Sequence, residues 1–174
     1  MSRFRHAFVA SFCGLVFCVA AGAQIITTLA GNVAVTDGQK ARQTPLVLPR
    51  TAVADQDGFI YVADDGSGTV RRIDPVTSIA TVIAGGGTLV DDLIPIPAKS
   101  AFLNSPVGLA IRSDKAVYIA DDANHRIRLL TPNGYITTVA GNGAGDFSGD
   151  GGLAVRAELN LPSGVAVDSA GNLY

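Results

Sequence analysis

The stretch Asp57-Gly58-Phe59-Ile60-Tyr61-Val62-Ala63-Asp64-Asp65 decides the fold, because it returns further along the chain. The second copy is Asp114-Lys115-Ala116-Val117-Tyr118-Ile119-Ala120-Asp121-Asp122, which begins 57 residues later. In both copies a short apolar run ends in two aspartates, as expected for a buried strand followed by a turn. The chain is therefore built from repeats, and the repeat has to be understood before any single element.

Two further markers share this period. Residues 26–32, Ile-Thr-Thr-Leu-Ala-Gly-Asn, return as residues 136–142, Ile-Thr-Thr-Val-Ala-Gly-Asn, with a looser copy between them at residues 80–86. Pro49, Pro106 and Pro162 are spaced by 57 and 56 residues. Because independent markers share one period, chance similarity is a poor explanation. The predicted repeat units cover approximately residues 24–46, 47–103, 104–160 and an incomplete 161–174.

Each unit divides into four strand candidates separated by turn residues. In the unit 104–160 these candidates are residues 107–111, 116–120, 126–129 and 135–140. The alternation in Arg126-Ile127-Arg128-Leu129 predicts a half-exposed strand with both arginines in solvent. No segment has the pattern of a long amphipathic helix. Four short strands per unit are typical of a propeller blade, so we predict an all-β fold of four-stranded antiparallel blades, a partial β-propeller.

The unit 104–160 resembles the NHL repeat, which is named for an Asn-His-Leu turn. The resemblance rests on residues 105–111, Ser-Pro-Val-Gly-Leu-Ala-Ile, on residues 117–121, Val-Tyr-Ile-Ala-Asp, and on Asn124-His125-Arg126. The glycine-rich residues 141–152 resemble the segment between blades in NHL arrays of exported bacterial proteins and of teneurins. This resemblance implies rings of about six blades, of which the chain would supply about two and a half. The unit 47–103 departs from it, with Gly66-Ser67-Gly68-Thr69 at the NHL turn.

The first residues predict a signal for export. A basic start with Arg3 and Arg5 precedes an apolar run over residues 7–21, and Ala21-Gly22-Ala23 fits a small-x-small cleavage site. The apolar run is shorter than the ~20 residues of a spanning helix. We therefore predict a Sec-type signal peptide over residues 1–23 and a secreted or periplasmic protein, with a retained N-terminal anchor as the alternative.

Removal of residues 1–23 changes what the folded part can do. Both cysteines leave, so no disulfide is available to the rest of the chain. Eleven basic residues (thirteen less Arg3 and Arg5) remain against fifteen acidic ones, a net charge near −4. No basic cluster is present, and we expect neither nucleic-acid binding nor attachment to a membrane surface.

The C-terminal end predicts a piece of a longer gene product. Tyr174 aligns with Tyr61 and Tyr118, which both lie inside a predicted strand, and the chain stops where the earlier copies continue. The mature chain would supply a lone fourth strand at residues 25–30, two nearly full blades and the beginning of another. The rival explanation is a ring of two or more copies, and the open propeller edges also predict self-association.

Geometry places the candidate ligand-binding residues on one face. In an up-and-down blade, the turn between the second and third strands leaves from the same face as the link to the next blade, and long links are often functional. Aspartates after strands more often close their own turns than bind cations, and we expect that role for the four such residues here. The candidates on this face are Asp64, Asp65, Asp121, Asp122, Asn124, His125, Asp146 and Asp150.

Calcium is the one metal for which the sequence contains part of a binding pattern. Asp146, Ser148 and Asp150 alternate before Gly151, as in the first half of a calcium loop. The twelfth position of such a loop would be Ala157, however, where a bidentate Glu is required. We expect a turn-rich loop and no cofactor, with calcium as the alternative.

A single histidine limits the catalytic chemistry of this part of the chain. His125 has no second histidine or cysteine beside it in the mature sequence, and we expect it to form a structural hydrogen bond in its turn. No Gly-x-Ser-x-Gly elbow is present. The sequence favours a binding or scaffold module for a protein or glycan over an enzyme. The alternative is the N-terminal part of an exported propeller enzyme, a lyase or lactonase-like hydrolase, with catalytic residues in further blades.

Overall fold

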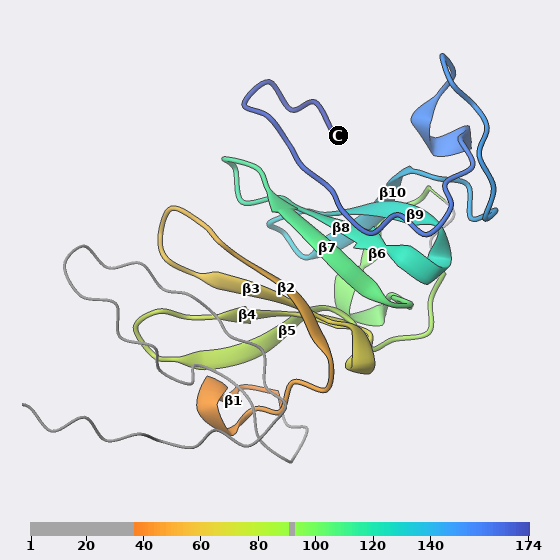
Figure 1. The fold of residues 1–174 in the computed structure, drawn as a ribbon. Coiled ribbons are helices and arrows are strands. Elements are labelled where there is room, and N and C mark those ends of the chain that lie inside the picture. Colours follow the sequence, from red (N-terminus) through yellow and green to blue (C-terminus); the bar gives the residue numbers. More distant parts are fainter. Residues whose placement is uncertain (1–36, 91–92) are drawn as a thin grey trace, which may run out of the picture.

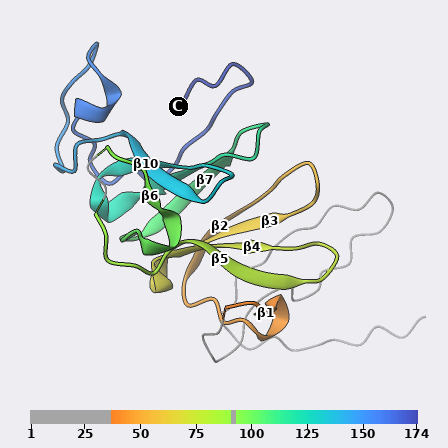
Figure 2. The ribbon, with the colours of Figure 1, turned by 180° about the vertical axis from the view of Figure 1, so that it is seen from behind.

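The computed structural model describes residues 37–90 and 93–174, which form two antiparallel sheets (Figures 1 and 2). The first sheet has the strand order β1-β5-β4-β3-β2, and the second has the order β6-β10-β9-β8-β7. Helical structure in the described residues consists of short 3₁₀ turns. The all-β, partial β-propeller fold predicted from the repeat is confirmed. The predicted signal peptide and the strand predicted at residues 25–30 lie outside the described residues.

Each sheet consists of four consecutive strands and a short fifth strand from the preceding link. We call β2 to β5 blade A and β7 to β10 blade B. The strands of blade A are Pro49–Ala54, Ile60–Asp64, Thr69–Ile73 and Ile79–Gly85, and those of blade B are Pro106–Ile111, Val117–Asp121, Arg126–Leu130 and Tyr135–Ala140. The added strands are β1, Gln39–Lys40, which pairs with β5, and β6, Ile96–Pro97, which pairs with β10. The four strands of blade B agree with the predicted ones to within a residue at either end.

Short 3₁₀ turns occupy equivalent places in successive repeats. One set follows the second strand of each blade and comprises η2, Asp65–Ser67, and η4, Asp122–Asn124. The other set lies in the segments that precede or follow a blade and comprises η1, Ala41–Gln43, η3, Ala98–Ser100, and η5, Ala154–Arg156. We call residues 86–105, which lead into blade B, the first link, and residues 141–161 the second link.

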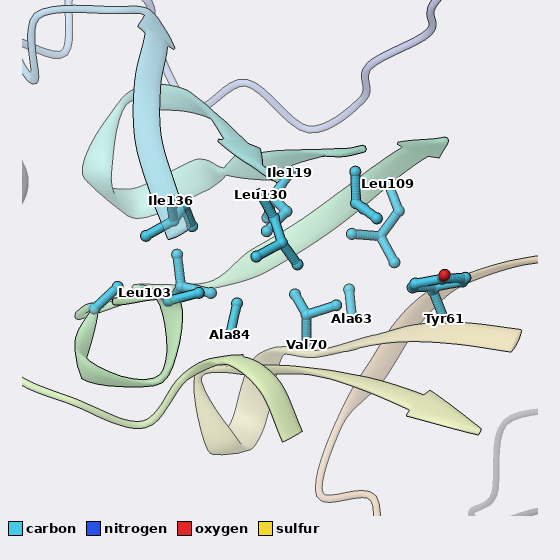
Figure 3. Close-up of a cluster of buried hydrophobic side chains, with 12 residues drawn as sticks. Tyr61, Ala63, Val70, Ala84, Leu103, Leu109, Ile119, Leu130 and Ile136 are labelled. Carbon is cyan, nitrogen blue, oxygen red and sulfur yellow. The ribbon is translucent and has the colours of Figure 1, made fainter. Parts of the chain in front are cut away.

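The main hydrophobic core lies between the two blades (Figure 3). The innermost strands β2 and β7 run side by side, and the Thr51 hydroxyl donates a hydrogen bond to the Val107 carbonyl at 2.6 Å. An apolar face of blade A meets an apolar face of blade B, so stacking the blades buries these two faces at once. Blade A contributes Tyr61, Ala63, Val70 and Ala84; blade B contributes Leu109, Val117, Ile119, Leu130 and Ile136; and the first link adds Ala98, Ala101 and Leu103.

The last described residues begin a third unit against the other face of blade B. Ala166 and Tyr174 exchange backbone hydrogen bonds of 2.9 Å, and Val167 bridges Leu173. Val165, Val167 and Leu173 pack on the buried Ala110, Tyr118, Ala120 and Ile127 of blade B. Both faces of blade B are therefore covered by neighbouring repeats.

One expectation about the third strand is wrong. The Arg128 side chain is 1% exposed, although the alternation predicted a solvated arginine. Arg128 pairs in register with Ile119, which belongs to the core between the blades, so both side chains lie on the face toward blade A. Arg126 is half-buried on the same face. Alternation of charged and aliphatic residues distinguishes the two faces of a strand. It does not show that one face is in solvent, because in a propeller both faces meet a neighbouring blade.

The repeated Ala-Gly pair has a structural cause at the end of the fourth strand. Gly85 and Gly141 both have a positive φ, of 84° and 86°. A Cβ at Gly85 would overlap the carbonyl oxygen of Gly68, and a Cβ at Gly141 would overlap that of His125. Gly68 and His125 are the left-handed residues that close the turns η2 and η4. The glycine thus lets the fourth strand leave its sheet directly against the preceding turn.

Candidate functional site

The turns η2 and η4 lie at the same end of the blades as the links, and we call this the loop end. The Asp65 backbone N–H donates to Leu48 O at 3.0 Å, and the Asp122 N–H donates to Ser105 O at 3.1 Å. Leu48 and Ser105 directly precede the first strands of blades A and B. The structure therefore brings each turn and its incoming segment together, in the same way in both repeats.

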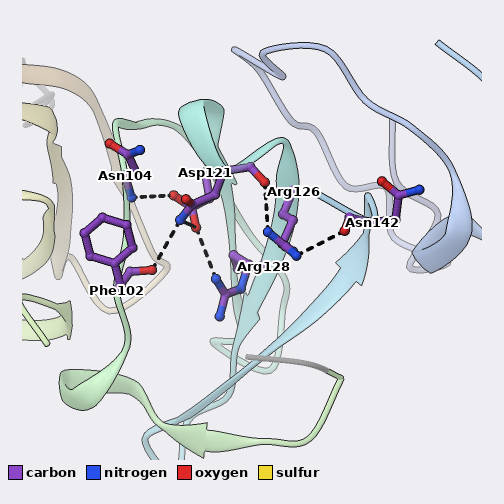
Figure 4. A network of polar contacts seen from close by, with 7 residues as sticks. Phe102, Asn104, Asp121, Arg126, Arg128 and Asn142 are labelled. Atoms are coloured by element: carbon purple, nitrogen blue, oxygen red, sulfur yellow. Dashed lines mark hydrogen bonds and ion pairs between the residues drawn. The ribbon is translucent and has the colours of Figure 1, made fainter. Parts of the chain in front are cut away.

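Asp121 is the centre of a buried polar network (Figure 4). Its Oδ1 accepts the Asn104 backbone N–H at 2.8 Å, and its Oδ2 accepts from Asn124 Nδ2 at 2.9 Å and from Arg128 Nη1 at 3.1 Å. The carboxylate is 0% exposed. Burial raises the pKa of Asp121, and the bonds from Asn124 and Asn104 and the charge of Arg128 oppose that rise. The network joins the first link, the turn and the third strand of blade B.

Asp64 occupies the equivalent place in blade A with different partners. Its Oδ1 accepts the backbone N–H groups of Val47 and Leu48 at 2.9 and 2.8 Å, and its Oδ2 accepts the Ser67 hydroxyl at 2.7 Å. The residue is fully buried. Asp64 and Asp121 both fasten an incoming segment to a blade, so neither carboxylate faces a ligand at the surface. The sequence predicted a turn-closing role but not this connection.

The remaining candidates in the turns are also engaged in local contacts. Asp65 forms an ion pair with Arg50 at 2.9 Å. The Asp122 carbonyl accepts the His125 backbone N–H at 2.9 Å. Asn124 also donates from Nδ2 to the Phe102 carbonyl at 3.3 Å, which ties the turn η4 to the first link a second time.

His125 connects blade B to the second link. It adopts the left-handed conformation with φ 54°, and its Nδ1 accepts the Leu161 backbone N–H at 3.2 Å. Beside it, Arg126 donates from Nη1 to Asn124 O and from Nη2 to Asn142 O, both at 3.1 Å (Figure 4). The imidazole of His125 therefore holds the end of the second link against blade B. In the described residues no His, Cys, Asp or Glu cluster of three or more is placed to hold a metal ion.

The second link is an ordered loop whose acidic residues point to no shared site. Asp146 accepts the N–H of the next residue, Phe147, at 2.8 Å. The Ser148 hydroxyl donates to Glu158 Oε2 at 2.7 Å, so one oxygen of the calcium pattern is bonded to the acid that lies one residue after the twelfth position of the pattern. Asp150 is exposed. The loop is closed by backbone bonds from Gly141 N to Ala154 O and from Asn142 N to Ala157 O, each 2.9 Å.

The described residues form several hollows that are open to a ligand. The one at the loop end, about 370 Å³, lies between the turn η2 and the first link and includes Asp65, Ser67 and Asn104 in its lining. At the opposite end, which we call the hairpin end, the three turns between first and second strands point the same way (Figure 1). They line a hollow of about 270 Å³ whose charged residues are Asp55, Asp57, Arg112, Lys115 and Asp168.

A larger hollow, of about 590 Å³, is a cleft between blades A and B. It is lined by side chains that the sequence did not single out, including Tyr61, Arg72, Lys99 and Lys115. Its volume falls in the range of ~300–1,000 Å³ that is typical of small-molecule sites. The sequence gives one indication of this cleft. Arg72 aligns with Leu129 in the next repeat, so the two copies carry different residues at a position where both form a strand.

Comparison with known proteins identifies the kind of repeat. Teneurin-m of Drosophila melanogaster is 32% identical over 151 residues, which is 79% of this chain and 5% of that protein. NHL repeat-containing protein 2 of Bos taurus is 33% identical over 73 residues, 41% of this chain and 10% of that protein. The chain thus spans a tenth or less of these curated relatives. No family model matches it.

Among solved structures, a structural-genomics protein of unknown function from Bacteroides thetaiotaomicron is similar with a TM-score of 0.64. It is 21% identical, and the match covers 86% of this chain and 36% of that one, which is a likeness of fold alone. The two blades, their loop-end network and their stacking define a β-propeller segment. Its repeats are of the NHL type, as the relatives confirm. In the part of the chain that the structure describes, no helix is long and apolar enough to span a bilayer.

Proposed function

We propose that this chain is part of an exported NHL-repeat propeller that acts as a binding or scaffold module for a protein or glycan partner. The observation that carries the proposal is the second link, an ordered loop that exposes large apolar side chains. Phe147 is 80% exposed, Leu153 63% and Leu161 52%. Exposed apolar groups held on an ordered loop are typical of an interaction surface.

The first link supports the same proposal. It carries Leu89, Val90, Leu93 and Ile94, which are exposed by 48%, 59%, 54% and 72%. Successive links thus both present apolar side chains, while the buried acids of the turns are occupied by structural bonds. Apolar side chains of this size favour a protein partner over a glycan.

A binding screen with a matched control tests this function. The chain is applied to an array of secreted and cell-surface proteins and to a glycan array. Binding to any hit is then compared for Phe147→Ser/Leu153→Ser and for Val76→Ser. Val76 is 90% exposed in the turn between the third and fourth strands of blade A, so it provides an apolar side chain away from the links.

We expect the double variant to weaken binding at least ~10-fold, since each buried apolar side chain contributes about 1.5–3 kcal/mol. Val76→Ser should bind like the parent chain. Equal loss in both variants, or binding that neither variant changes, contradicts a partner site on the second link.

Export is tested separately, by expression of the full chain in a bacterial host. We expect the protein in the periplasmic or secreted fraction with Gln24 as its first residue, since the basic start and small-x-small motif end there. A cytoplasmic protein that keeps Met1 contradicts export.

A further inference from the structure

We propose that the cleft between blades A and B binds a small organic anion with a flat apolar body. This site is at the hairpin end and is independent of the partner proposed for the links. Its lining comes from both blades and from the first link, all within the described residues. The site therefore needs no further blade to be formed.

The charges that line the cleft are all positive. Arg72, Lys99 and Lys115 contribute to its wall, and no Asp or Glu does. Lys115 forms an ion pair with Asp57, and Lys99 lies 3.5 Å from Asp37, but both lysine side chains are at least half exposed and remain accessible. A cleft whose charged lining residues are all cations attracts an anion.

Arg72 is the residue best placed to fix that anion. Its guanidinium lies over the Phe59 ring, 4.8 Å from the centroid, which limits its motion. In the described part of the chain it has no ion-pair partner. A planar guanidinium held by an aromatic ring is suited to bind a carboxylate through two parallel hydrogen bonds.

The rest of the wall selects for an apolar body. Ile83, Val117 and Leu130 form an aliphatic part of the lining, to which the exposed Pro97 and Pro132 also belong. Tyr61 contributes its ring, and its hydroxyl is bonded to Asp55 at 3.1 Å. Burial, with the bond to Asp55, raises the pKa of this phenol, so it stays neutral.

The repeat itself shows that the fold does not need this arrangement. Where blade A has Phe59 and Arg72, blade B has Ala116 and Leu129 at the aligned positions. The four strands form in both blades, so the stacking of Arg72 on Phe59 in blade A is not required for the fold. An exposed arginine that the architecture does not require is a candidate for recognition.

The test uses naphthalene-2-carboxylate and its neutral match, naphthalene-2-carboxamide, with the full chain. Affinities are measured by isothermal titration calorimetry for the parent chain, Arg72→Leu and Arg156→Leu. Arg72→Leu installs the residue of the next repeat, and Arg156→Leu removes the same charge from an exposed position in the second link. Thermal melting checks that each variant is folded.

We expect the carboxylate to bind the parent chain about 10-fold or more tightly than the amide, as a charge-assisted pair predicts. Arg72→Leu should reduce the carboxylate to the affinity of the amide, and Arg156→Leu should leave both unchanged. Equal affinities for the two probes, equal loss in both variants, or no saturable binding of the carboxylate overturns the proposal.

Discussion

Asp64 and Asp121 end the second strands of blades A and B, yet their surroundings differ. Asp121 pairs with the buried Arg128 at 3.1 Å, whereas the Asp64 carboxylate is held by two backbone N–H groups and a serine hydroxyl. The arginine aligned with Arg128 is Arg71, which is 2% exposed and whose Nε and Nη1 have no hydrogen-bond partner in the described residues. The two blades thus share a backbone scaffold and the anchoring carboxylate, while the charge balance around it is particular to each repeat.

The largest expected effect comes from removing the carboxylate that has an arginine partner. Asp121→Ala should lower the free energy of unfolding by about 3–5 kcal/mol, because it leaves the Arg128 charge buried without its carboxylate. Asp64→Ala should cost about 1–3 kcal/mol, since it leaves neutral donors unpaired. Urea unfolding of both variants measures the difference. Equal costs would mean that the charge of Arg128 does not distinguish the blades.

Replacing the glycine at the end of the fourth strand should, in contrast, lower the stability by the same amount in both blades. Gly85→Ala and Gly141→Ala should each cost about 2–4 kcal/mol, from the left-handed backbone and the overlap with a carbonyl oxygen. Gly134→Ala is the control, because Gly134 has φ 83° with nothing within 4 Å of its Cβ position. It should cost only about 1–2 kcal/mol by the same urea measurement. A cost at Gly134 as large as at Gly141 would contradict the overlap.

A smaller effect is expected at the residue that closes the turn, which is Gly68 in blade A and His125 in blade B. His125→Ala keeps the left-handed strain and loses the hydrogen bond to Leu161, so it should cost about 1–2 kcal/mol. His125→Gly loses the same bond but relieves the strain and should cost about 1 kcal/mol less. Thermal melting of the two variants checks the order. A glycine variant that is less stable than the alanine variant would show that imidazole packing outweighs backbone strain.

The smallest effect concerns the residue six places before each tyrosine of the repeat. Tyr61 and Tyr174 donate to Asp55 and Asp168, whereas the Tyr118 hydroxyl accepts from Arg112 at 3.2 Å. Arg112 also binds Asp114, and its hydrogen bonds lower the pKa of that carboxyl to about 2.

Because this folded-state pKa is lowered, the stabilisation is present above the ordinary value of 3.8 and is lost as the pH falls toward about 2. Arg112→Gln should raise the pKa of Asp114 toward its ordinary value, which a nuclear magnetic resonance titration of the carboxyl carbon measures. The cost in stability at neutral pH should stay below about 1 kcal/mol, since both side chains are more than a third exposed. An unchanged pKa of Asp114 would contradict the assigned cause.

The same comparison explains what the sequence could predict. Strands and turns depend on local patterns that recur in every unit, so the four strands of blade B were predicted to within a residue. The loop-end position of Asp121 and His125 followed from counting strands. The burial of Arg128 did not follow, because alternation cannot tell a face against solvent from a face against another blade.

Contacts between units are the part that local patterns miss. The two-residue strands β1 and β6 are too short to leave a periodic signal, and they form only where a link passes an outer strand. The cleft depends on Arg72 from one repeat and Lys115 from the next, two residues 43 positions apart. Sequence indicates such a place only indirectly, as a position where aligned copies carry different residues.

The short strands β1 and β6 also bear on solubility. Each covers part of the outermost strand of its sheet, which would otherwise offer free backbone groups to a second molecule. Strand β1 ends in Lys40, and β6 ends in Pro97, which has no N–H to donate. A charge and a missing donor both discourage the addition of a foreign strand. The strands β1 and β6 therefore protect the outer edge of each sheet against aggregation by sheet extension.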